Sequence, residues 1–521
     1  MSSRTVKWLL LASVLLIAFP VVAGASTARV AGLGIQGDYI KDYTNVYTYL
    51  SNISFVGNVV YGELGNLYGS TTSDRGVGAI LGNLFDGRYG TLGIRMSEET
   101  AQLGQGDANT PVGAGFGAWD PNVNTSHAFD ILWGKKFGKA SLGLQMNRSY
   151  SHAVGDPFIV DFVGSGYSWK EIEGDDFSAG APEDLNYHRN ILGFGGGIGL
   201  EVSPTFTLEA SMLYQSRTFS AVDTLYDQTT FSYTVFPGGG SPGYDNDVIP
   251  GQKWENDGSG AYLMALRGLY QAKPDLLLVP MFKYYSQKAD VKGTFIVPSG
   301  FGTHTGVGPD LQYDFYPAGS DSLFGGESIS LTDEDQRSCW QVGLAGNWTL
   351  NQNDLFVIGA TVASNQHTVK SMDVVQTGDI PRTTTPPLTS SYVYSEPFVN
   401  FSGKFTETLM PSIFAALETH VNSWLTLRLG ATQGVFYSVK HEFEDFEYNY
   451  LTDKVEAVRG SKNVTTYHYS PFTMELGAGF KLGTLQLDAT VNPAFVHNGP
   501  YLISGASTGG MFPRVTATYT F

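Results

Sequence analysis

Three groups of side chains in this sequence have residue types that could support chemistry. The first is the run Gly193-Phe-Gly-Gly-Gly-Ile-Gly199, which has the letters of a nucleotide-binding glycine loop. Alternating Ile198, Leu200 and Val202 follow in place of a helix pattern. We therefore expect these glycines to relieve crowding on the inner face of a curved strand, or to let a plug lie close to it. No cofactor and no cofactor-binding residue is predicted.

The second group could form a hydrolytic site. Glu418 and His420 share one strand face with Ser412, and His152 lies beside Ser149 and Ser151. Nothing like a nucleophile elbow surrounds these serines, and nine histidines in 521 residues give such neighbours by chance. We predict that the protein is not an enzyme, with no catalytic residue and no metal site.

Charged residues on one face of alternating segments form the third group. In residues 472–482, Phe472 and Met474 lie on the face opposite Glu475 and Lys481. If the apolar face meets lipid, the charged residues face the interior of a barrel. There they would line a wet pore and set its selectivity, or pair with each other and with a plug. The predicted pore-lining residues are Arg95, Asp130, Glu209, Arg217, Arg267, Lys283, Glu418, Arg428, Glu475, Lys481, Asp488 and Arg514.

The C-terminal segment shows most clearly the strand pattern that such a barrel wall requires. Val515, Ala517, Tyr519 and Phe521 fall on one face, and threonines fall on the other. This period of two predicts a strand with one face in lipid and one in water. It resembles the closing strand of bacterial outer-membrane barrels. That resemblance implies that the terminal aromatic Phe521 marks the chain for the barrel assembly machinery.

The N-terminal segment has the pattern of an export signal. Arg4 and Lys7 precede an apolar stretch, and Ala23-Gly-Ala25 offers small residues for cleavage. No later apolar run approaches 18 residues, so a membrane location requires a closed barrel. The expected organisation is a signal peptide at 1–25, an N-terminal periplasmic or plug segment at 26–52, and an outer-membrane barrel at 53–521.

Composition and segment lengths agree with that class. Charged residues make up 15% of the chain, with 63 Gly, 32 Phe, 29 Tyr and one Cys, which suits strands that face lipid. Short turn-forming links alternate with long polar stretches. We predict an all-β fold, a transmembrane antiparallel β-barrel of about sixteen strands (alternatively fourteen), with short periplasmic turns and long extracellular loops. The expected loops are roughly 97–127, 153–187, 220–258, 290–337, 371–409 and 442–470.

Aromatic residues at the ends of the apolar rows favour a membrane barrel over a soluble sandwich. Trp340 and Trp348 share a face and are eight residues apart, which is about 26 Å along a strand. This spacing places one indole near each membrane interface. Tyr214 and Tyr519 end other apolar rows in the same way. These four residues are the predicted aromatic girdle.

The segment before the first alternating strand resembles the opening of the FadL-type family of hydrophobic-compound transporters. Gly32, Gly34, Gly37, Asp42 and Asn45 follow the order of that family's Gly-rich stretch and acidic residue. The resemblance implies a hatch folded inside the barrel. The family's Asn-Pro-Ala turn is absent here, and its barrels have fourteen strands. A disordered periplasmic leader is the alternative.

These observations give three functional hypotheses for a protein of the outer membrane. The first is a porin-like channel for passive diffusion of small solutes, the second a FadL-like plugged transporter, and the third a structural or adhesive barrel. The net charge of −18 and the acidic loops suggest contact with outer-membrane lipid and lipopolysaccharide through bridging divalent cations. Other expected partners are the barrel assembly machinery and small solutes, with no nucleic acid. The sequence is compatible with a homotrimer.

Overall fold

A computed structural model gives the fold of the described residues. They are 26–65, 75–82, 84, 87–97, 128–155, 158–162, 167–171, 185–223, 251–256, 258–296, 301–303, 313–315, 328–351, 354–378, 392–449, 454–492, 496 and 511–521. The expected signal peptide and the side chains of the acidic stretch 156–184 lie outside this part. No helix within it is long and apolar enough to cross a bilayer.

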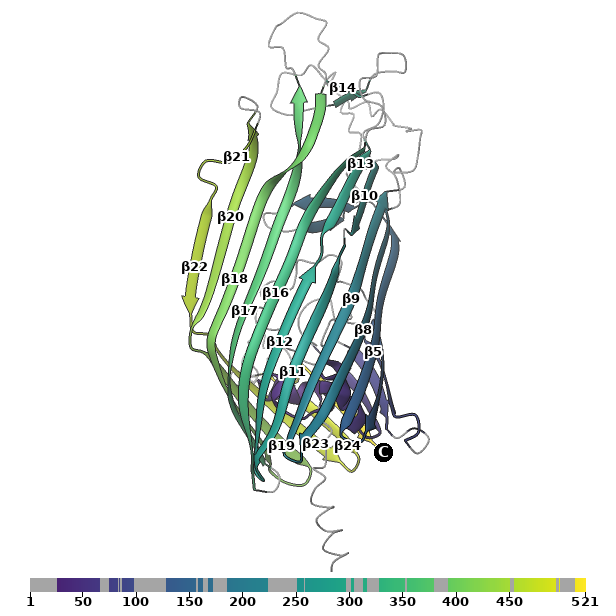
Figure 1. Ribbon diagram of the computed structural model, residues 1–521, viewed down its shortest axis with the longest axis vertical. Coiled ribbons are helices and arrows are strands. Elements are labelled where there is room, and N and C mark those ends of the chain that lie inside the picture. Colours follow the sequence, from purple (N-terminus) through teal and green to yellow (C-terminus); the bar gives the residue numbers. More distant parts are fainter. Residues whose placement is uncertain are drawn as a thin grey trace, which may run out of the picture.

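One antiparallel sheet closes on itself to form the barrel wall (Figure 1). The first and last strands complete the circle, with Val59 opposite Thr520 and Leu64 opposite Val515. Four wall strands are each divided into two labelled parts, because both parts pair with the same neighbouring wall strand. Counted this way the wall has sixteen strands, which confirms the predicted fold class and strand number.

In chain order the wall strands rise and descend alternately. They are β1 (Val59–Leu64), β2 (Arg75–Leu81), β3 (Thr91–Ser97), β4 (Ala128–Phe137), β5 (Ala140–Gly155), β8 (Leu185–Ser203), β9 (Phe206–Asp223), β10 with β11 (Gly251–Asn256 and Gly260–Lys273), β12 with β13 (Leu276–Lys288 and Val291–Ile296), β16 (Ser328–Leu350), β17 (Asp354–Gly378), β18 (Tyr392–His420), β19 with β20 (Leu425–Gly434 and Tyr437–Asn449), β22 with β23 (Asn463–Tyr469 and Phe472–Leu482), β24 (Leu485–Val491) and β25 (Val515–Thr520).

Some short strand pairs are not part of this wall. The pairs are β6 (Phe158–Phe162) with β7 (Tyr167–Glu171), β14 (Phe301–Thr303) with β15 (Tyr313–Phe315), and β21 (Lys454–Ala457) with the upper end of β20. All of them follow the upper ends of wall strands. The stretches expected to be extracellular loops therefore contain some sheet of their own.

Alternation decides which side chains face lipid. In β3, Leu92, Ile94 and Met96 are exposed on the outside, whereas Arg95 is buried on the inside. The same pattern recurs around the wall, with an apolar outer face and a polar or small inner face. Because the apolar side chains lose contact with water only in a bilayer, this surface is a lipid-facing belt.

The wall is much taller on one side than on the other (Figure 1). Strands β1, β2, β3, β24 and β25 have six or seven residues each, whereas β16, β17 and β18 have 23, 25 and 29. At ordinary strand rise and tilt, the described strands of the low side span about 15–18 Å and those of the tall side up to about 75 Å. An outer-membrane apolar belt is about 25 Å tall.

Four of the expected loops are therefore partly wrong, since 220–258 contains the wall strand β10 (Gly251–Asn256) and three others contain parts of longer wall strands. Residues 371–378 and 392–409 belong to β17 and β18, and β20 and β22 extend into the stretch 442–470. Strand β16 likewise begins within 290–337. Above the membrane both faces of a strand meet water, so polar residues occupy both faces and the period of two is lost.

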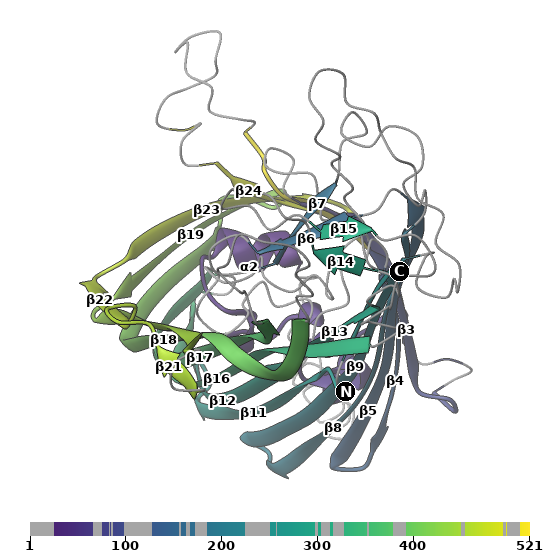
Figure 2. The same ribbon diagram turned by 90° about the horizontal axis from the view of Figure 1, so that it is seen from above.

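The N-terminal segment lies inside the barrel (Figure 2), in its lower half (Figure 1). We call residues 26–56 the plug. It contains the helix α2 (Thr27–Gly32) and the 3-10 turns η1 (Gly37–Tyr39), η2 (Tyr43–Tyr47) and η3 (Leu50–Phe55). Ser26 caps α2 by accepting a hydrogen bond from the Arg29 amide. The first wall strand thus begins at Val59, later than the expected residue 53.

Candidate functional site: the plugged lumen

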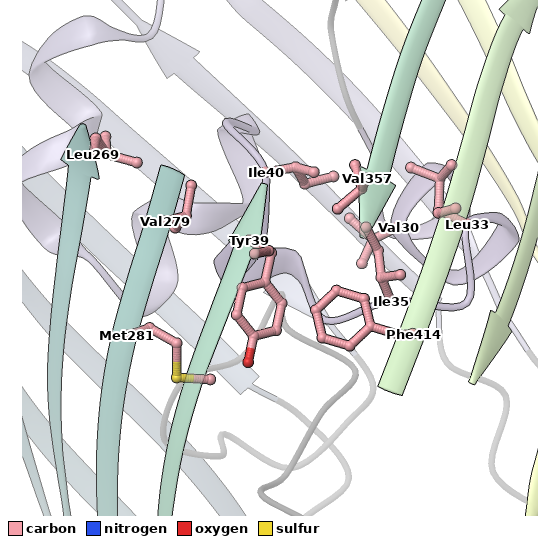
Figure 3. Close-up of a cluster of buried hydrophobic side chains, with 12 residues drawn as sticks. Val30, Leu33, Ile35, Tyr39, Ile40, Leu269, Val279, Met281, Val357 and Phe414 are labelled. Atoms are coloured by element: carbon pink, nitrogen blue, oxygen red, sulfur yellow. The ribbon is translucent and has the colours of Figure 1, made fainter. Parts of the chain in front are cut away.

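Apolar packing joins one part of the plug to the tall wall (Figure 3). Val30, Leu33 and Tyr39 of the plug are buried against Met281 of β12 and Phe414 of β18. The Tyr39 and Phe414 rings lie 4.7 Å apart at their centroids. These inner-wall residues are apolar at positions where a water-filled channel would carry polar ones. The plug therefore has a hydrophobic core in common with the wall.

A second apolar cluster joins the end of the plug to the low wall. Leu50 and Ile53 are fully buried among Ile80 of β2, Leu132 of β4 and Leu263 of β11. Burial of side chains of this size stabilises the docked position by about 1.5–3 kcal/mol each. The two clusters lie at opposite ends of the plug, so both of its ends are fixed to the wall.

Glycines of β8 make room for the plug. A Cβ atom on Gly197 would lie 3.0 Å from the Leu50 Cβ, and one on Gly199 would lie 3.0 Å from the Ser51 Oγ. A Cβ on Gly195 would lie 2.8 Å from a Leu50 methyl group. The prediction that this glycine run lets a plug lie close to the wall is confirmed.

Other wall glycines allow the plug backbone itself to approach. A Cβ on Gly143 of β5 would overlap the Leu50 carbonyl, and one on Gly430 of β19 would overlap the Leu33 carbonyl. Larger side chains at these positions would push the plug away from the wall. Sequence alone does not distinguish such glycines from those that only relieve strand curvature.

A buried cluster of charges fixes helix α2 to three wall strands. The Arg29 Nε and Nη2 atoms donate to the two Glu418 carboxylate oxygens, each at 2.7 Å. Arg428 also donates to Glu418 at 2.6 Å and forms an ion pair with Asp488 at 2.8 Å. The Ser26 hydroxyl donates to the other Asp488 oxygen at 2.9 Å. Each carboxylate therefore joins the plug to the wall.

A second buried charge cluster holds the middle of the plug. Lys283 of β12 forms an ion pair with Asp38 at 2.6 Å, and Asp38 also accepts a hydrogen bond from the Tyr49 hydroxyl at 2.9 Å. Arg267 of β11 forms an ion pair with Glu209 of β9 at 2.7 Å, and its guanidinium lies 4.0 Å from the Tyr49 ring centroid. Arg267 further donates to the Asp38 carbonyl at 2.8 Å.

A third polar cluster joins the plug to the low wall. The Thr27 hydroxyl donates to Glu63 of β1 at 2.9 Å, and Arg95 of β3 donates to the same carboxylate at 3.3 Å. The Arg95 guanidinium lies 5.1 Å from the Tyr47 ring centroid. The Tyr47 and Tyr61 hydroxyl groups are hydrogen bonded to each other. Three clusters thus fix the plug around the circumference of the barrel.

Two further predicted pore-lining residues are buried by polar neighbours of the wall. Asp130 accepts a hydrogen bond from the Gln145 side chain at 2.9 Å, and Arg217 donates to Gln215 at 3.4 Å. Both charged side chains point inward and are nearly inaccessible. Alternation therefore predicted the inner face at these positions, but these side chains do not line open water.

The last three predicted pore-lining residues lie away from the buried clusters. Glu475 is partly buried and touches the plug, since a Cβ on Gly34 would lie 3.1 Å from its side chain. Lys481 is exposed beside the periplasmic turn of β23, and Arg514 precedes β25 and is partly buried. Taken with the buried pairs, these positions do not support a wet pore lined by twelve charges.

The hydrolytic candidates are separated by the structure. Glu418 is held by Arg29 and Arg428, whereas the His420 ring lies 3.9 Å from Asp354 at the periplasmic rim. Ser412 lies higher on the inner face of β18. Within the described residues, no group of three His, Cys, Asp or Glu side chains could hold a metal ion.

The predicted girdle residues point outward. Trp340, Tyr214 and Tyr519 expose 37%, 49% and 47% of their surface on the lipid-facing side, and Trp348 is partly exposed. The Phe521 ring stacks on Tyr519, 5.9 Å away at the centroids. These positions suit interfacial anchors. The role of Phe521 as an insertion signal stays a prediction.

Sequence reasoning missed an aromatic surface above the plug. We call Phe405, Tyr437, His441, Phe443 and Tyr467 the inner aromatic surface, because strand register places them on the inner face of β18, β20 and β22. The Phe405 ring lies 5.0 Å from His441 and 5.1 Å from Phe443, and His441 lies 6.0 Å from Tyr467. Phe405, Phe443 and Tyr467 lie in stretches expected to be loops, so no alternating strand was predicted for them.

The plug anchors Arg29 and Asp38 were also missed. Neither lies in an alternating segment, and only the family resemblance drew attention to Asp42 nearby. Burial raises the pKa of the Asp42 carboxyl to about 6, although the Arg29 Nη1 atom 3.5 Å away opposes this shift. Asp42 is therefore a titratable group that is buried when the plug is docked.

Comparison with known proteins gives distant similarity. No protein-family model and no curated protein matches this sequence. Among solved structures, the chain is similar to the Ralstonia pickettii toluene transporter TbuX, with 11% identity over 96% of this chain and 99% of that chain, and a TM-score of 0.31. A Pseudomonas aeruginosa FadL homologue has 11% identity over 96% and 99%, with a TM-score of 0.33. The ferric-catecholate import receptor Fiu from E. coli K12 has 8% identity over 89% and 82%, with a TM-score of 0.30.

The membrane location follows from the wall itself. In this closed antiparallel barrel every wall strand has a hydrogen-bonded neighbour on both sides. The outer face carries exposed apolar and aromatic side chains. The chain is an outer-membrane β-barrel with a plug inside its lumen.

Proposed function

We propose that this protein carries hydrophobic compounds across the outer membrane through a plugged barrel. The observation that carries the proposal is the position of residues 26–56, which occupy the lower lumen with two apolar clusters and three polar ones. Ions and small hydrophilic solutes need a continuous water column. A plug that shares its core with the wall interrupts that column, which favours a transporter over a porin.

The lining above the plug supports an apolar cargo. Leu409, Tyr437 and Val439 form an inward-facing buried cluster, and the rest of the inner aromatic surface continues from it. Apolar and aromatic lining gives affinity for hydrophobic molecules through the area that they bury. Such a surface offers little to a hydrated ion. One structure to which the chain is similar is named as a toluene transporter, and another is named as a FadL homologue.

Conductance and uptake together test the proposal. Purified protein in planar bilayers should show near silence, while cells that make the protein should take up a radiolabelled apolar probe such as toluene faster than cells without it. A large steady conductance would instead support the porin. Silence without any gain in uptake would support a structural or adhesive barrel.

A further inference from the structure

The inner wall above the plug contains a buried carboxylate whose hydrogen-bond donors are both neutral. Glu407 of β18 exposes only 4% of its surface. Its two oxygens accept hydrogen bonds from the Asn365 side chain at 3.1 Å and from the Tyr437 hydroxyl at 2.8 Å. In the part of the chain that the structure describes, no lysine or arginine forms an ion pair with Glu407. The negative charge of this group is therefore held by neutral donors alone.

This property distinguishes Glu407 from the buried acids around the plug. Glu418, Glu209 and Asp38 each form an ion pair with an arginine or a lysine. A buried carboxylate without a positive neighbour is costly in free energy. Glu475 of β23, which touches the plug on the same inner face, likewise forms no ion pair with a described residue. A cation supplied by a ligand would therefore be stabilised on this side of the lumen.

Aromatic rings lie beside Glu407 on the inner face. Phe405 is two residues away on β18, and the Tyr437 ring contacts Tyr469 of β22 edge-on, 4.6 Å away at the centroids. Strand register places Tyr467 and Tyr469 on the same inner face as Tyr437. They expose 54% and 51% of their surface, so their rings are accessible to a ligand.

An amide oxygen beside Glu407 adds a further acceptor. Asn365 of β17 lies opposite Glu407 in the strand register, and its side chain is almost completely buried. The Asn365 Nδ2 atom donates to Glu407, whereas its Oδ1 atom accepts no hydrogen bond from the described residues. The amide cannot be reversed, because an ionised carboxylate only accepts. Acceptors thus exceed donors here, which favours a ligand that carries positive charge.

We propose that the lumen above the plug binds hydrophobic cations, compounds in which an ammonium group is joined to an apolar or aromatic body. The ammonium group lies against the Tyr437 and Tyr469 rings, because the faces of such rings attract cations. Glu407 adds its negative charge behind Tyr437 and, through their hydrogen bond, polarises the ring. The apolar body packs on Phe405. This inference rests on the proposed function, since it names the class of hydrophobic compound that the plugged barrel carries.

Two probes of the same shape test the inference. Phenyltrimethylammonium and tert-butylbenzene differ only in a positively charged nitrogen that replaces a carbon. Binding of each probe to purified protein in lipid nanodiscs is measured by equilibrium dialysis, with empty nanodiscs as the blank. Wild type should bind the cation at least about tenfold more tightly than its uncharged isostere, as expected for an ammonium beside aromatic rings and a buried carboxylate.

Matched variants locate the site. The double variant E407Q/E475Q should lose about tenfold in this preference, because it removes both negative charges. Tyr469→Leu should lose about threefold, whereas Tyr469→Phe, which keeps the ring, should match wild type. Glu444→Gln is the control for charge, because Glu444 lies on the outer face of β20, opposite Ser402. It should leave the preference unchanged.

Several outcomes would overturn the inference. They are equal binding of the two probes by wild type, an unchanged preference in E407Q/E475Q, and an equal fall for both probes in the variants, which would assign these residues a structural role. Toluene uptake by cells separates this inference from the proposed function. Toluene uptake without a preference for the cation would retain the proposed function and reject the inference. A preference for the cation without toluene uptake would support the inference and limit the proposed function to charged cargo.

Discussion

Arg29 of the plug and Glu418 of the wall form a two-point ion pair, with both nitrogen–oxygen distances at 2.7 Å and both side chains almost completely buried. The two residues are 389 positions apart in the chain. This pair, shared with Arg428, connects the plug to the barrel through two short, buried, charge-assisted hydrogen bonds. Plug docking can therefore be tested by conservative substitutions in this pair.

Glu418→Gln should release the plug. The change leaves Arg29 and Arg428 buried without their shared carboxylate, and such a loss typically costs about 3–5 kcal/mol. We expect steady or flickering ion conductance in planar bilayers where wild type is nearly silent. Glu201→Gln is the control, because the Glu201 pair with Lys136 is exposed at the rim. A silent E418Q channel would contradict this role.

Gly430→Val should displace the plug by steric overlap. Its side chain would occupy the position of the Leu33 carbonyl, and overpacking of this kind usually costs about 1–3 kcal/mol or more. Cells with this variant should become several-fold more sensitive to a bulky hydrophilic antibiotic. Gly62→Val, at a site with no atom within 4 Å of the added Cβ, should leave sensitivity unchanged. Equal sensitivity of the two variants would argue against close contact between Gly430 and the plug backbone.

Plug docking should weaken as pH rises through about 6. The pKa of Asp42 is raised by burial from 3.8 to about 6, so the docked state holds a proton that an exposed Asp42 would release. Its contribution to docking is complete below about pH 4 and is lost above pH 6. Channel openings should therefore increase between pH 4 and pH 7. Asp42→Asn should flatten this dependence, and an unchanged profile in D42N would assign it to another group.

Phe405→Ala should reduce uptake without opening the channel. The Phe405 ring contacts His441 and Phe443 above the plug, and its loss removes apolar area from the inner aromatic surface. We expect apolar-probe uptake to fall several-fold while bilayer conductance stays near zero. Phe436→Ala, at an exposed position on the outside of the barrel, is the control. Full uptake by F405A would exclude this surface from the transport path.

The wall could be predicted from sequence because alternation is a local property. Each side chain of β3 or β23 shows its face by its polarity alone, and the closing strand ends in Tyr519 and Phe521 as expected. The strand number of sixteen and the outer-membrane class followed from repeating this argument along the chain. Because one face of each wall strand lies in lipid, the alternation of apolar and polar side chains is strict there.

The interior could not be predicted to the same depth. Alternation places Glu418, Arg267 and Lys283 on the inner face but does not say what they meet there. Their partners Arg29 and Asp38 lie in a segment without periodicity, hundreds of residues away. The sequence left a wet pore and a plug as open alternatives, and only the tertiary contacts distinguish them.

The height of the tall wall has a consequence outside the cell. Strand β18, with 29 residues, rises about 75 Å, so roughly 50 Å of ordered sheet stands beyond an apolar belt of about 25 Å. Antibodies raised against the folded protein should therefore bind intact bacteria through this continuous sheet. An immunogen built from β16 to β20 would need to keep that sheet folded to elicit antibodies that bind living cells.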